Sequence, residues 1–345
     1  MKPLETNRLI LRKYTHDDVA AVNSYSNCDE NIIYMLFDAQ SIDDTRNFIN
    51  MTISKAEETP MTDYFYAATL KDTGELIGGC SLHMRGEDVA EIGWIVHRDY
   101  WKQGYATEMG QGLLELGFED LNLHRIVAYC DAENIGSYRI MEKLRMRREG
   151  LLQDARPGNK KNKKPYSDML AYAMLKSDWD TAKEIAYYNS LPVEFNDFID
   201  VPTLSNGEIF LICTEKYTNP EKKHVPSYKF AICKNGEQIG FCDLRIGYGG
   251  GEKGDNLYYG GNIGYTIYEK FRGNGYAVEA CKLLVPIAHA HKMTKLLITN
   301  NVENTASRRV CEKLGAKLLR PARLPEYNDL YKEGQRFSNT FEWSV

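Results

Sequence analysis

An internal repeat constrains the fold of this chain more than any other feature of its sequence. Residues 74–82 (GELIGGCSL) match residues 236–244 (GEQIGFCDL), and residues 133–144 (ENIGSYRIMEKL) match residues 303–314 (ENTASRRVCEKL). Between these blocks, an IG pair and a GYA segment also recur in each half, in the same order and at a nearly constant offset. Repeats of this kind indicate a duplicated structural unit, so we expect two domains of similar fold.

The length of the chain agrees with two domains, because 345 residues exceed what one ordinary hydrophobic core supports. Residues 176–192 are expected to form a helix that ends at Pro192, and we place the boundary in this segment. The first domain is therefore assigned to residues 1–185 and the second to residues 186–345.

Each half is predicted to be an α/β domain with a mixed sheet. Hydrophobic patterns predict a hairpin, a third strand, a helix, a fourth strand, a second helix and a terminal hairpin in both halves. The first half has room for two further helices, at residues 16–27 and 42–58, whereas the second half has only residues 215–229 at that place. The second half also carries a glycine-rich insertion, residues 247–261, which we expect to form a flexible hairpin or a lid.

The composition excludes several classes of protein. A net charge of -5 gives no electrostatic footprint for nucleic acid, and no apolar run reaches the ~18 residues of a membrane-spanning helix. The eight cysteines form no C-x-x-C pair, which indicates buried thiols in a reducing compartment rather than a metal site or a disulfide framework. We therefore expect a cytoplasmic protein that has no metal site and has neither nucleic acid nor a membrane as a partner.

One short segment has the features of a phosphate-binding turn. Residues 272–277 (RGNGYA) follow a strand and open a helix, and residues 101–106 (WKQGYA) do the same in the first half. Glycine allows a tight turn, and the first turn of a helix offers unpaired N–H groups with a partial positive charge. Together these features can cradle a pyrophosphate, to which Arg272 adds a charge-assisted contact. The alternative is a plain strand-to-helix turn, but the segment occurs twice, each time before an Asn-x-x-Ser sequence.

These motifs resemble those of the GNAT superfamily of N-acetyltransferases. The family signature, Arg/Gln-x-x-Gly-x-Gly/Ala, is matched by Arg272, Gly275 and Ala277. The first half has Trp101 at the first position, and its context AEIGWIVHRDYWKQGYATE is similar to the Rim-type branch, which acetylates ribosomal-protein N-termini and in which tryptophan is common there. The resemblance covers residues 4–178 and 204–345. It implies two tandem acyl-CoA N-acyltransferase domains, each a twisted mixed sheet flanked by helices and splayed open between the strands at 90–96 and 125–130 in the first half.

The resemblance also implies where acetyl-CoA would bind. Pantetheine would pair with the backbone of Trp94, Ile95 and Val96, or with Tyr265, Thr266 and Ile267 in the second half. The pyrophosphate would lie on Lys102, Gln103, Gly104, Tyr105, Ala106 and Thr107, or on Arg272, Gly273, Asn274, Gly275, Tyr276 and Ala277. Asn134 and Asn304 match a family position that contacts the cofactor arm, and both also suit a helix N-cap.

Amide formation requires removal of a proton from the attacking ammonium and, at the leaving thiolate, a proton donor. Glu91 is the candidate base in the first half, with an outward-facing strand glutamate as the alternative, and the second half has Asn262 there. The tyrosine that serves as general acid in many GNAT enzymes is replaced by Met141 and Cys311. The Rim-type resemblance points instead to Ser137 and Ser307, which could equally be helix-start residues.

Two further features are given ordinary interpretations. The basic cluster at residues 160–164 is expected to be a solvated hairpin tip, with attraction of an acidic acceptor or the CoA 3′-phosphate as the alternative. His83, His97 and His124 lack metal-ligand spacing and are interpreted as ordinary surface or core residues.

The sequence therefore predicts an N-acetyltransferase that transfers acetyl from acetyl-CoA to a primary amine by direct attack in a ternary complex. A protein N-terminus, a polyamine, an amino sugar or another small amine all remain open as acceptors. The alternative is an acyl-CoA-binding regulatory or scaffold protein in which one or both copies are inactive. The chain could be a monomer whose tandem copies mimic a dimer, or a homodimer.

Overall fold

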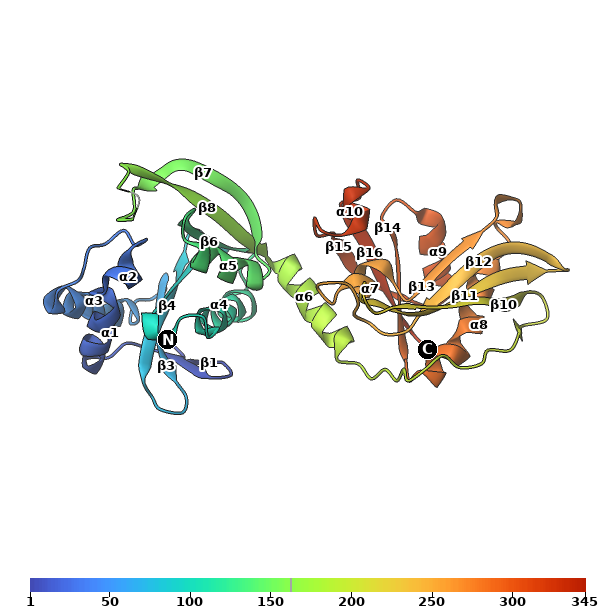
Figure 1. Ribbon diagram of the computed structural model, residues 1–345, viewed down its shortest axis with the longest axis horizontal. Helices are drawn as coiled ribbons and strands as arrows, with labels where there is room; N and C mark the ends of the chain where they lie inside the picture. The colour runs from blue at the N-terminus through green and yellow to red at the C-terminus, as the bar shows by residue number, and fades with distance from the viewer. Residues whose placement is uncertain (162) are drawn as a thin grey trace. The chain divides into compact units, whose positions relative to one another are not determined.

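Two units that share a common set of strands and helices make up the structure. The computed structural model describes residues 1–161 and 163–345, and it divides into unit 1, Met1–Trp179, and unit 2, Asp180–Val345 (Figure 1). Helix α6 (Lys176–Asn189) contains this division. The expected boundary after residue 185 lies in the same helix, and the assignment of 1–185 and 186–345 as domains stays a prediction.

In the described part of unit 1, the strands form one mixed sheet in the order β1-β2-β3-β4-β5-β6-β8-β7. Their bounds are β1 Leu4–Glu5, β2 Leu9–Arg12, β3 Asp63–Leu70, β4 Leu76–Met84, β5 Val89–Val96, β6 Arg125–Asp131, β7 Arg147–Pro157 and β8 Tyr166–Leu175. β5 and β6 are parallel and pair at Val89–Arg125, Ala90–Ile126 and Glu91–Val127, after which they diverge. The splayed mixed sheet predicted for the first half is therefore confirmed.

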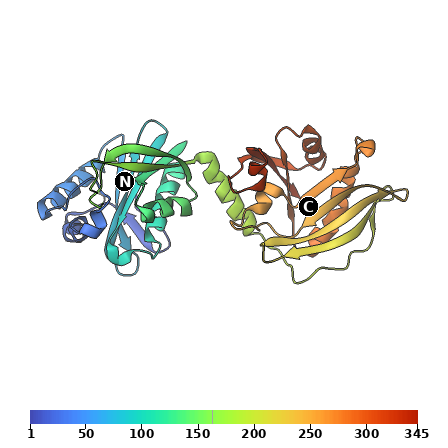
Figure 2. The same ribbon diagram turned by 45° about the horizontal axis from the view of Figure 1, so that its top comes forward.

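Helices cover both faces of this sheet (Figures 1 and 2). On one side lie α1 (Val19–Ser26), α2 (Asp29–Ile32) and α3 (Ile42–Lys55), and on the other α4 (Tyr105–Glu115) and α5 (Ile135–Lys143). Side chains of β5 alternate between the two faces of the sheet, so this strand contributes to the core on each side. Ile92 belongs to the core beneath α4, whereas Ile95 packs in the cluster that contains Ile49 of α3. α3 begins at a capping box, in which Ser41 and Asp44 each accept the other's backbone N–H.

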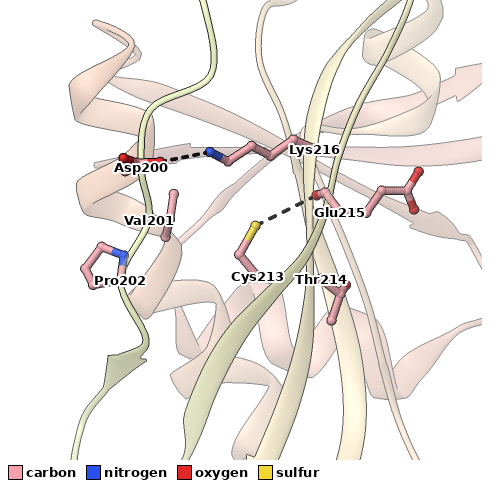
Figure 3. Close-up of a pocket in the computed structure, with 7 residues that line it drawn as sticks. All are labelled: Asp200, Val201, Pro202, Cys213, Thr214, Glu215 and Lys216. Atoms are coloured by element: carbon pink, nitrogen blue, oxygen red, sulfur yellow. Dashed lines mark hydrogen bonds and ion pairs between the residues drawn. The ribbon is translucent and has the colours of Figure 1, made fainter.

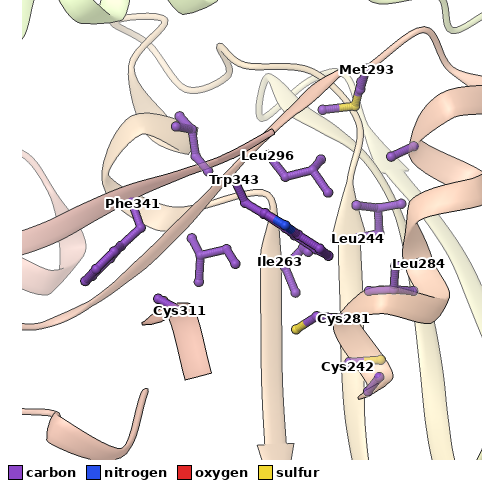
Figure 4. Close-up of a cluster of buried hydrophobic side chains, with 14 of the residues drawn as sticks. Cys242, Leu244, Ile263, Cys281, Leu284, Met293, Leu296, Cys311, Phe341 and Trp343 are labelled. Atoms are coloured by element: carbon purple, nitrogen blue, oxygen red, sulfur yellow. The ribbon is translucent and has the colours of Figure 1, made fainter. Parts of the chain in front are cut away.

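Unit 2 repeats these elements, but its described strands form two sheets. One has the order β13-β12-β11-β10-β9 and the other β14-β16-β15. The bounds are β9 Leu204–Ser205, β10 Phe210–Asn219, β11 His224–Lys234, β12 Glu237–Arg245, β13 Ile263–Ile267, β14 Lys295–Asn301, β15 Lys317–Arg323 and β16 Phe337–Ser344, with helices α7 Asn256–Gly260, α8 Tyr276–Ala290, α9 Thr305–Lys313 and α10 Asp329–Lys332. Trp343 of β16 packs with Ile263, Leu284 and Cys281 between the two sheets (Figure 4).

Asn262 joins the two sheets of unit 2. Its side-chain N–H₂ group donates to the carbonyls of Arg245 (3.0 Å) and Gly247 (2.6 Å), and its Oδ1 accepts from the N–H of Leu297 on β14 (2.8 Å). Its own N–H donates to the carbonyl of Leu297, and the residue is fully buried. The position that holds Glu91 in unit 1 thus serves in unit 2 as a structural link.

The units differ at the two places where the sequence indicated a difference. Unit 2 connects β10 to β11 by a short turn where unit 1 has α1, α2 and α3, as expected. The glycine-rich insertion was expected to be a flexible hairpin or lid, and this expectation is wrong. It contains α7, whose side chains Leu257, Tyr258 and Tyr259 are buried against β14 and β16. Removal of these aromatic and apolar side chains from water favours a fixed position for the insertion.

Helix α6 contributes side chains to each unit. Near its start, Trp179 packs on Phe118 of unit 1, with 5.7 Å between ring centroids. Further along, Asp180 and Glu184 hold Arg320 at 3.1 and 2.7 Å within unit 2.

Candidate active site

The strand-to-helix turn has the same backbone conformation in both units. In unit 1, Lys102 and Gly104 have φ values of 61° and 90°, and in unit 2 Gly273 and Gly275 have φ values of 86° and 82°. Left-handed residues at alternate positions make a concave set of backbone N–H groups, and the first turn of the following helix adds more. Each turn therefore presents a concave set of backbone N–H groups at the start of α4 or α8, which is chemically suited to an anion.

Trp101 makes the same contact as the arginine of the family signature. Its indole N–H donates to the carbonyl of Val96 at 2.7 Å, while Nε of Arg272 donates to the carbonyl of Ile267 at 3.1 Å. Both bonds close the turn onto the end of the preceding strand. The departure of unit 1 from the signature therefore preserves the hydrogen bond on which the turn depends.

This equivalence predicts how substitutions at Trp101 behave. Trp101→Phe keeps most of the ring area but loses the donor, and should weaken acetyl-CoA binding by roughly 5-fold, the worth of about 1 kcal/mol for one hydrogen bond. Trp101→Arg should bind within about 2-fold of the wild type, since Arg can restore the donor. Calorimetric titration of the three proteins checks this, and equal affinities for the phenylalanine and arginine variants would contradict it.

One cavity of about 1200 Å³ in unit 1 brings most of the predicted site residues together. It is lined by Trp94, Ile95, Val96, Lys102, Gly104, Tyr105, Ala106, Thr107, Asn134 and Ser137. Gln103 lies outside the described lining, where its carbonyl accepts from Arg8 and its amide donates to the carbonyl of Asp99. The cavity runs through the opening between β5 and β6.

The register of β5 decides which backbone groups face this opening. The N–H of Arg85 donates to the carbonyl of Val89, and the N–H of His97 donates to the carbonyl of Ile77. Antiparallel pairing alternates, so the odd-numbered residues of β5 bond to β4 while Trp94 and Val96 direct their backbone away from it. Pantetheine was expected on Trp94, Ile95 and Val96, of which Ile95 bonds to β4 and the carbonyl of Val96 already accepts from Asn31 and Trp101.

The cavity continues beneath α1, α2 and α3, where it is lined by side chains that the sequence analysis did not single out. They include Tyr14, Tyr25, Glu30, Tyr34, Phe48, Phe65, Ser81, Asp131 and Arg156. The sequence indicated these lining residues only through the two extra helices predicted in the first half. The other residues reach the cavity through strand pairing between distant parts of the chain, which the sequence does not display.

Arg156 of β7 and two lysines that follow this strand contact the segment after α2. Arg156 donates to the carbonyl of Tyr34 at 2.7 Å, Nζ of Lys161 lies 3.1 Å from the Tyr34 hydroxyl, and Lys160 pairs with Asp38 at 3.2 Å. The described lysines of the basic cluster are exposed, as the interpretation as a solvated tip expected, and Lys161 also lines the cavity. Asn162 of that cluster lies outside the described residues.

Asn134 and Asn304 are helix caps in both units. Oδ1 of Asn134 accepts from the N–H of Ser137 at 3.1 Å, and Oδ1 of Asn304 accepts from the N–H of Ser307 at 3.0 Å. Asn134 and Ser137 also line the cavity, so the cap holds the start of α5 at its wall.

Glu91 lies in the last row of β5–β6 pairing, opposite Val127. Its carboxylate accepts from Nε and Nη2 of Arg85 at 3.0 and 2.9 Å. Among the described residues it does not line the cavity. The role of Glu91 as base stays a prediction, and its position does not favour it.

The corresponding region of unit 2 is bridged by a hydrogen bond. The hydroxyl of Tyr265, at the position of Trp94, lies 2.9 Å from Oγ of Ser307 on α9. Burial raises the pKa of the Tyr265 phenol and raises the pKa of the Cys311 thiol to about 12, so both groups stay protonated at neutral pH. Tyr276 and Ala277 are buried at the start of α8, while Thr266, Arg272, Gly273 and Asn274 are exposed and Ile267 and Gly275 are half-buried.

A shallow groove of about 620 Å³ lies elsewhere in unit 2, between residues 200–202 and β10 (Figure 3). Lys216 and Asp200 face each other across it at 3.4 Å, and Cys213 lies beside the carbonyl of Glu215. The predicted site residues do not line it. In the described ranges, 1–161 and 163–345, we find no cluster of side chains suited to a metal ion and no helix long and apolar enough to cross a membrane.

Comparison with known proteins found a family model and several relatives that match this chain. A family model described as "Acetyltransferase (GNAT) domain" matches residues 8–147 and again 167–317. The uncharacterized N-acetyltransferase YnaD of Bacillus subtilis (strain 168) is 36% identical over 181 residues, which are 51% of this chain and 99% of YnaD. The uncharacterized N-acetyltransferase p20 of Bacillus licheniformis is 31% identical over 182 residues, 52% of this chain and 99% of p20. A crystal structure of a GNAT-family acetyltransferase from Bacillus anthracis is 33% identical, covers 51% of this chain and 99% of its own, and has a TM-score of 0.45.

The family model and the relatives define an acyltransferase with two copies of one domain. The chain belongs to the GNAT acetyltransferase family, whose model it matches twice. The resemblance inferred from the motifs is thereby confirmed, and so is the tandem arrangement.

Proposed function

We propose that this chain transfers acetyl from acetyl-CoA to a primary amine by direct attack, and that unit 1 carries out the reaction. The observation that carries the proposal is the single cavity that reaches from the turn at Lys102–Thr107 to the underside of α1–α3. One end of it suits a nucleotide diphosphate, and the other end, beneath α1–α3, would admit an acceptor.

The residues of unit 1 suit acetyl-CoA as the donor. The turn at residues 101–107 (WKQGYAT) has no acidic side chain, carries Lys102 and offers the N–H groups of a helix start to the pyrophosphate. The backbone of Trp94 and Val96 would pair with the pantetheine arm. Acetyl-CoA would supply a thioester, which is an activated form of the acetyl group.

The part of the cavity beneath α1–α3 would accept the amine. Tyrosine and phenylalanine rings and the carboxylates of Glu30, Asp131 and Glu133 line the cavity and would attract an ammonium group, while Arg156 and Lys161 add positive charge to the same lining. A protein N-terminus, a polyamine, an amino sugar or another small amine would meet this requirement. Ser137, at the wall near the opening, is our candidate to give a proton to the leaving thiolate.

A second role is favoured for unit 2. The bridge between Tyr265 and Ser307 ties β13 to α9 at the place where unit 1 is open, and helices equivalent to α1–α3 are not among its described elements. We propose that unit 2 is an acyl-CoA-binding or scaffold copy with little turnover of its own.

A reducing, cytoplasmic location is supported by the cysteines, all of which are free in the described residues.

The test is an acetyl-transfer assay on the intact protein with a panel of amines. Release of CoA thiol and the mass of the product would be recorded with the wild type, Ser137→Ala and Ser307→Ala. We expect transfer to at least one amine, a loss of roughly 10- to 100-fold in Ser137→Ala, and a near wild-type rate in Ser307→Ala. Acetyl-CoA binding without transfer to any amine would contradict the proposal and favour a scaffold role for both units.

A further inference from the structure

Three side chains on β3 and β4 of unit 1 form a hydrogen-bonded chain that ends at the cavity. Nδ1 of His83 lies 2.7 Å from Oδ1 of Asp63, and Nε2 of His83 lies 2.9 Å from Oγ of Ser81. Ser81 lines the cavity, whereas His83 and Asp63 lie behind it. The order leading away from the cavity is therefore hydroxyl, imidazole and carboxylate.

The hydrogen bonds define the direction in which a proton can move. The bond from His83 lowers the pKa of the Asp63 carboxyl, and the charge of Lys55 acts in the same direction, so Asp63 is an ionised acceptor. The hydrogen of neutral His83 then lies on Nδ1, and the lone pair of Nε2 faces the hydroxyl of Ser81. Ser81 can therefore pass its hydroxyl proton to His83 when it accepts another proton from the cavity.

The surroundings hold this chain in place. His83 packs edge-on against Phe65, with 5.0 Å between ring centroids. Glu91 lies directly opposite His83 in the β4–β5 register, but its carboxylate is bound by Arg85. The charged groups that surround the imidazole are thus Asp63 with Lys55 on one side and Glu91 with Arg85 on the other.

Unit 2 has lost this chain. The repeat places Asp243 and Arg245 where unit 1 has Ser81 and His83, and these two residues form an ion pair at 3.0 Å. Arg245 also donates to the carbonyls of Gly260 and Gly261. The difference coincides with the absence, from the described part of unit 2, of helices equivalent to α1–α3.

We propose that Ser81, His83 and Asp63 form the proton relay that converts the acceptor's ammonium into a free amine. The inference rests on the function proposed above. One N–H bond of the ammonium breaks as its proton passes to Oγ of Ser81, whose own proton moves to Nε2 of His83. His83 becomes an imidazolium held by Asp63, and the neutral amine keeps the electron pair with which it attacks. Ser81 is the residue that touches the acceptor, and His83 and Asp63 act through it.

The relay is tested with Ser81→Ala, His83→Gln and Asp63→Asn, and with His97→Gln as a matched control that lies off the cavity lining. We expect kcat/KM at neutral pH to fall about 100-fold in His83→Gln, the lower end of the range for general-base catalysis, while acetyl-CoA affinity changes less than about 2-fold. The acidic limb of the pH profile should disappear in His83→Gln and remain in His97→Gln. β,β,β-Trifluorinated analogues of the accepted amine, which are neutral at assay pH, should restore most of the lost rate because they do not require the initial deprotonation.

A second readout does not depend on turnover. Nitrogen NMR of the His83 ring in the wild type should show a proton on Nδ1, and Ser81→Ala should change the Nε2 resonance while leaving the Nδ1–H tautomer in place. An unchanged pH profile in all three variants, or equal losses with basic and fluorinated amines, would overturn the relay while the proposed function stands. Failure of the wild type to acetylate any amine would overturn both.

Discussion

Replacing Gly104 with glutamate should abolish acetyl-CoA binding by unit 1. Gly104 has a φ of 90°, and a side chain there costs about 1–2 kcal/mol in the left-handed region. The new carboxylate would also stand at the N–H surface that we assign to the pyrophosphate, where it repels the same charge. We expect a loss of at least about 100-fold in affinity by calorimetric titration.

Two variants separate these causes. Gly74→Glu places the same side chain at a φ of 74° in the β3–β4 turn, with no atom within 4 Å and away from the cavity lining, and should bind acetyl-CoA normally. Gly275→Glu changes the equivalent turn of unit 2 and should remove any second binding event while leaving the first. Unaltered binding in Gly104→Glu would show that this turn does not hold the donor, and loss in Gly275→Glu alone would assign binding to unit 2.

Replacing Asn262 with alanine should destabilise unit 2 by roughly 3–5 kcal/mol. The change leaves the N–H of Leu297 and the carbonyls of Arg245 and Gly247 without their partner, and each buried unpaired group costs about 1–3 kcal/mol. Denaturant unfolding followed by hydrogen exchange at the amides of β14 measures the loss where it should occur. Exchange in β5 of unit 1 should be unaffected.

Asn304→Ala provides the comparison for Asn262, because it removes an asparagine at an exposed helix cap. That change should cost about 1 kcal/mol. If both substitutions cost the same, water reaches the groups that Asn262 satisfies, and the junction of the two sheets does not depend on this side chain.

The features that the sequence predicted well are those that are local and repeated. The turn at Gly104 and Gly275 and the caps at Asn134 and Asn304 each depend on a few consecutive residues, and each occurs twice. Their conformations could therefore be inferred from turn and cap chemistry alone. The missing helices of the second half could likewise be inferred, since a gap of a few residues has no room for them.

The features that the sequence did not predict depend on residues brought together by the fold. Ser81 and His83 are two apart on a strand, so they share a face, but only the register of β3 brings Asp63 to them. The hydrogen bond from Trp101 to the carbonyl of Val96 depends on the three-dimensional path of the turn. The sequence alone therefore did not show that this tryptophan acts as a donor. The sequence favoured Glu91 as the base, but in the structure its carboxylate is paired with Arg85 on the sheet.

Helix α6 has a consequence for any attempt to study the halves alone. A fragment that ends at residue 185 would take Asp180 and Glu184 with it and leave Arg320 of the other fragment without either carboxylate. A fragment that begins at residue 176 would instead remove Trp179 from Phe118. Each half expressed separately therefore needs its own copy of the whole helix.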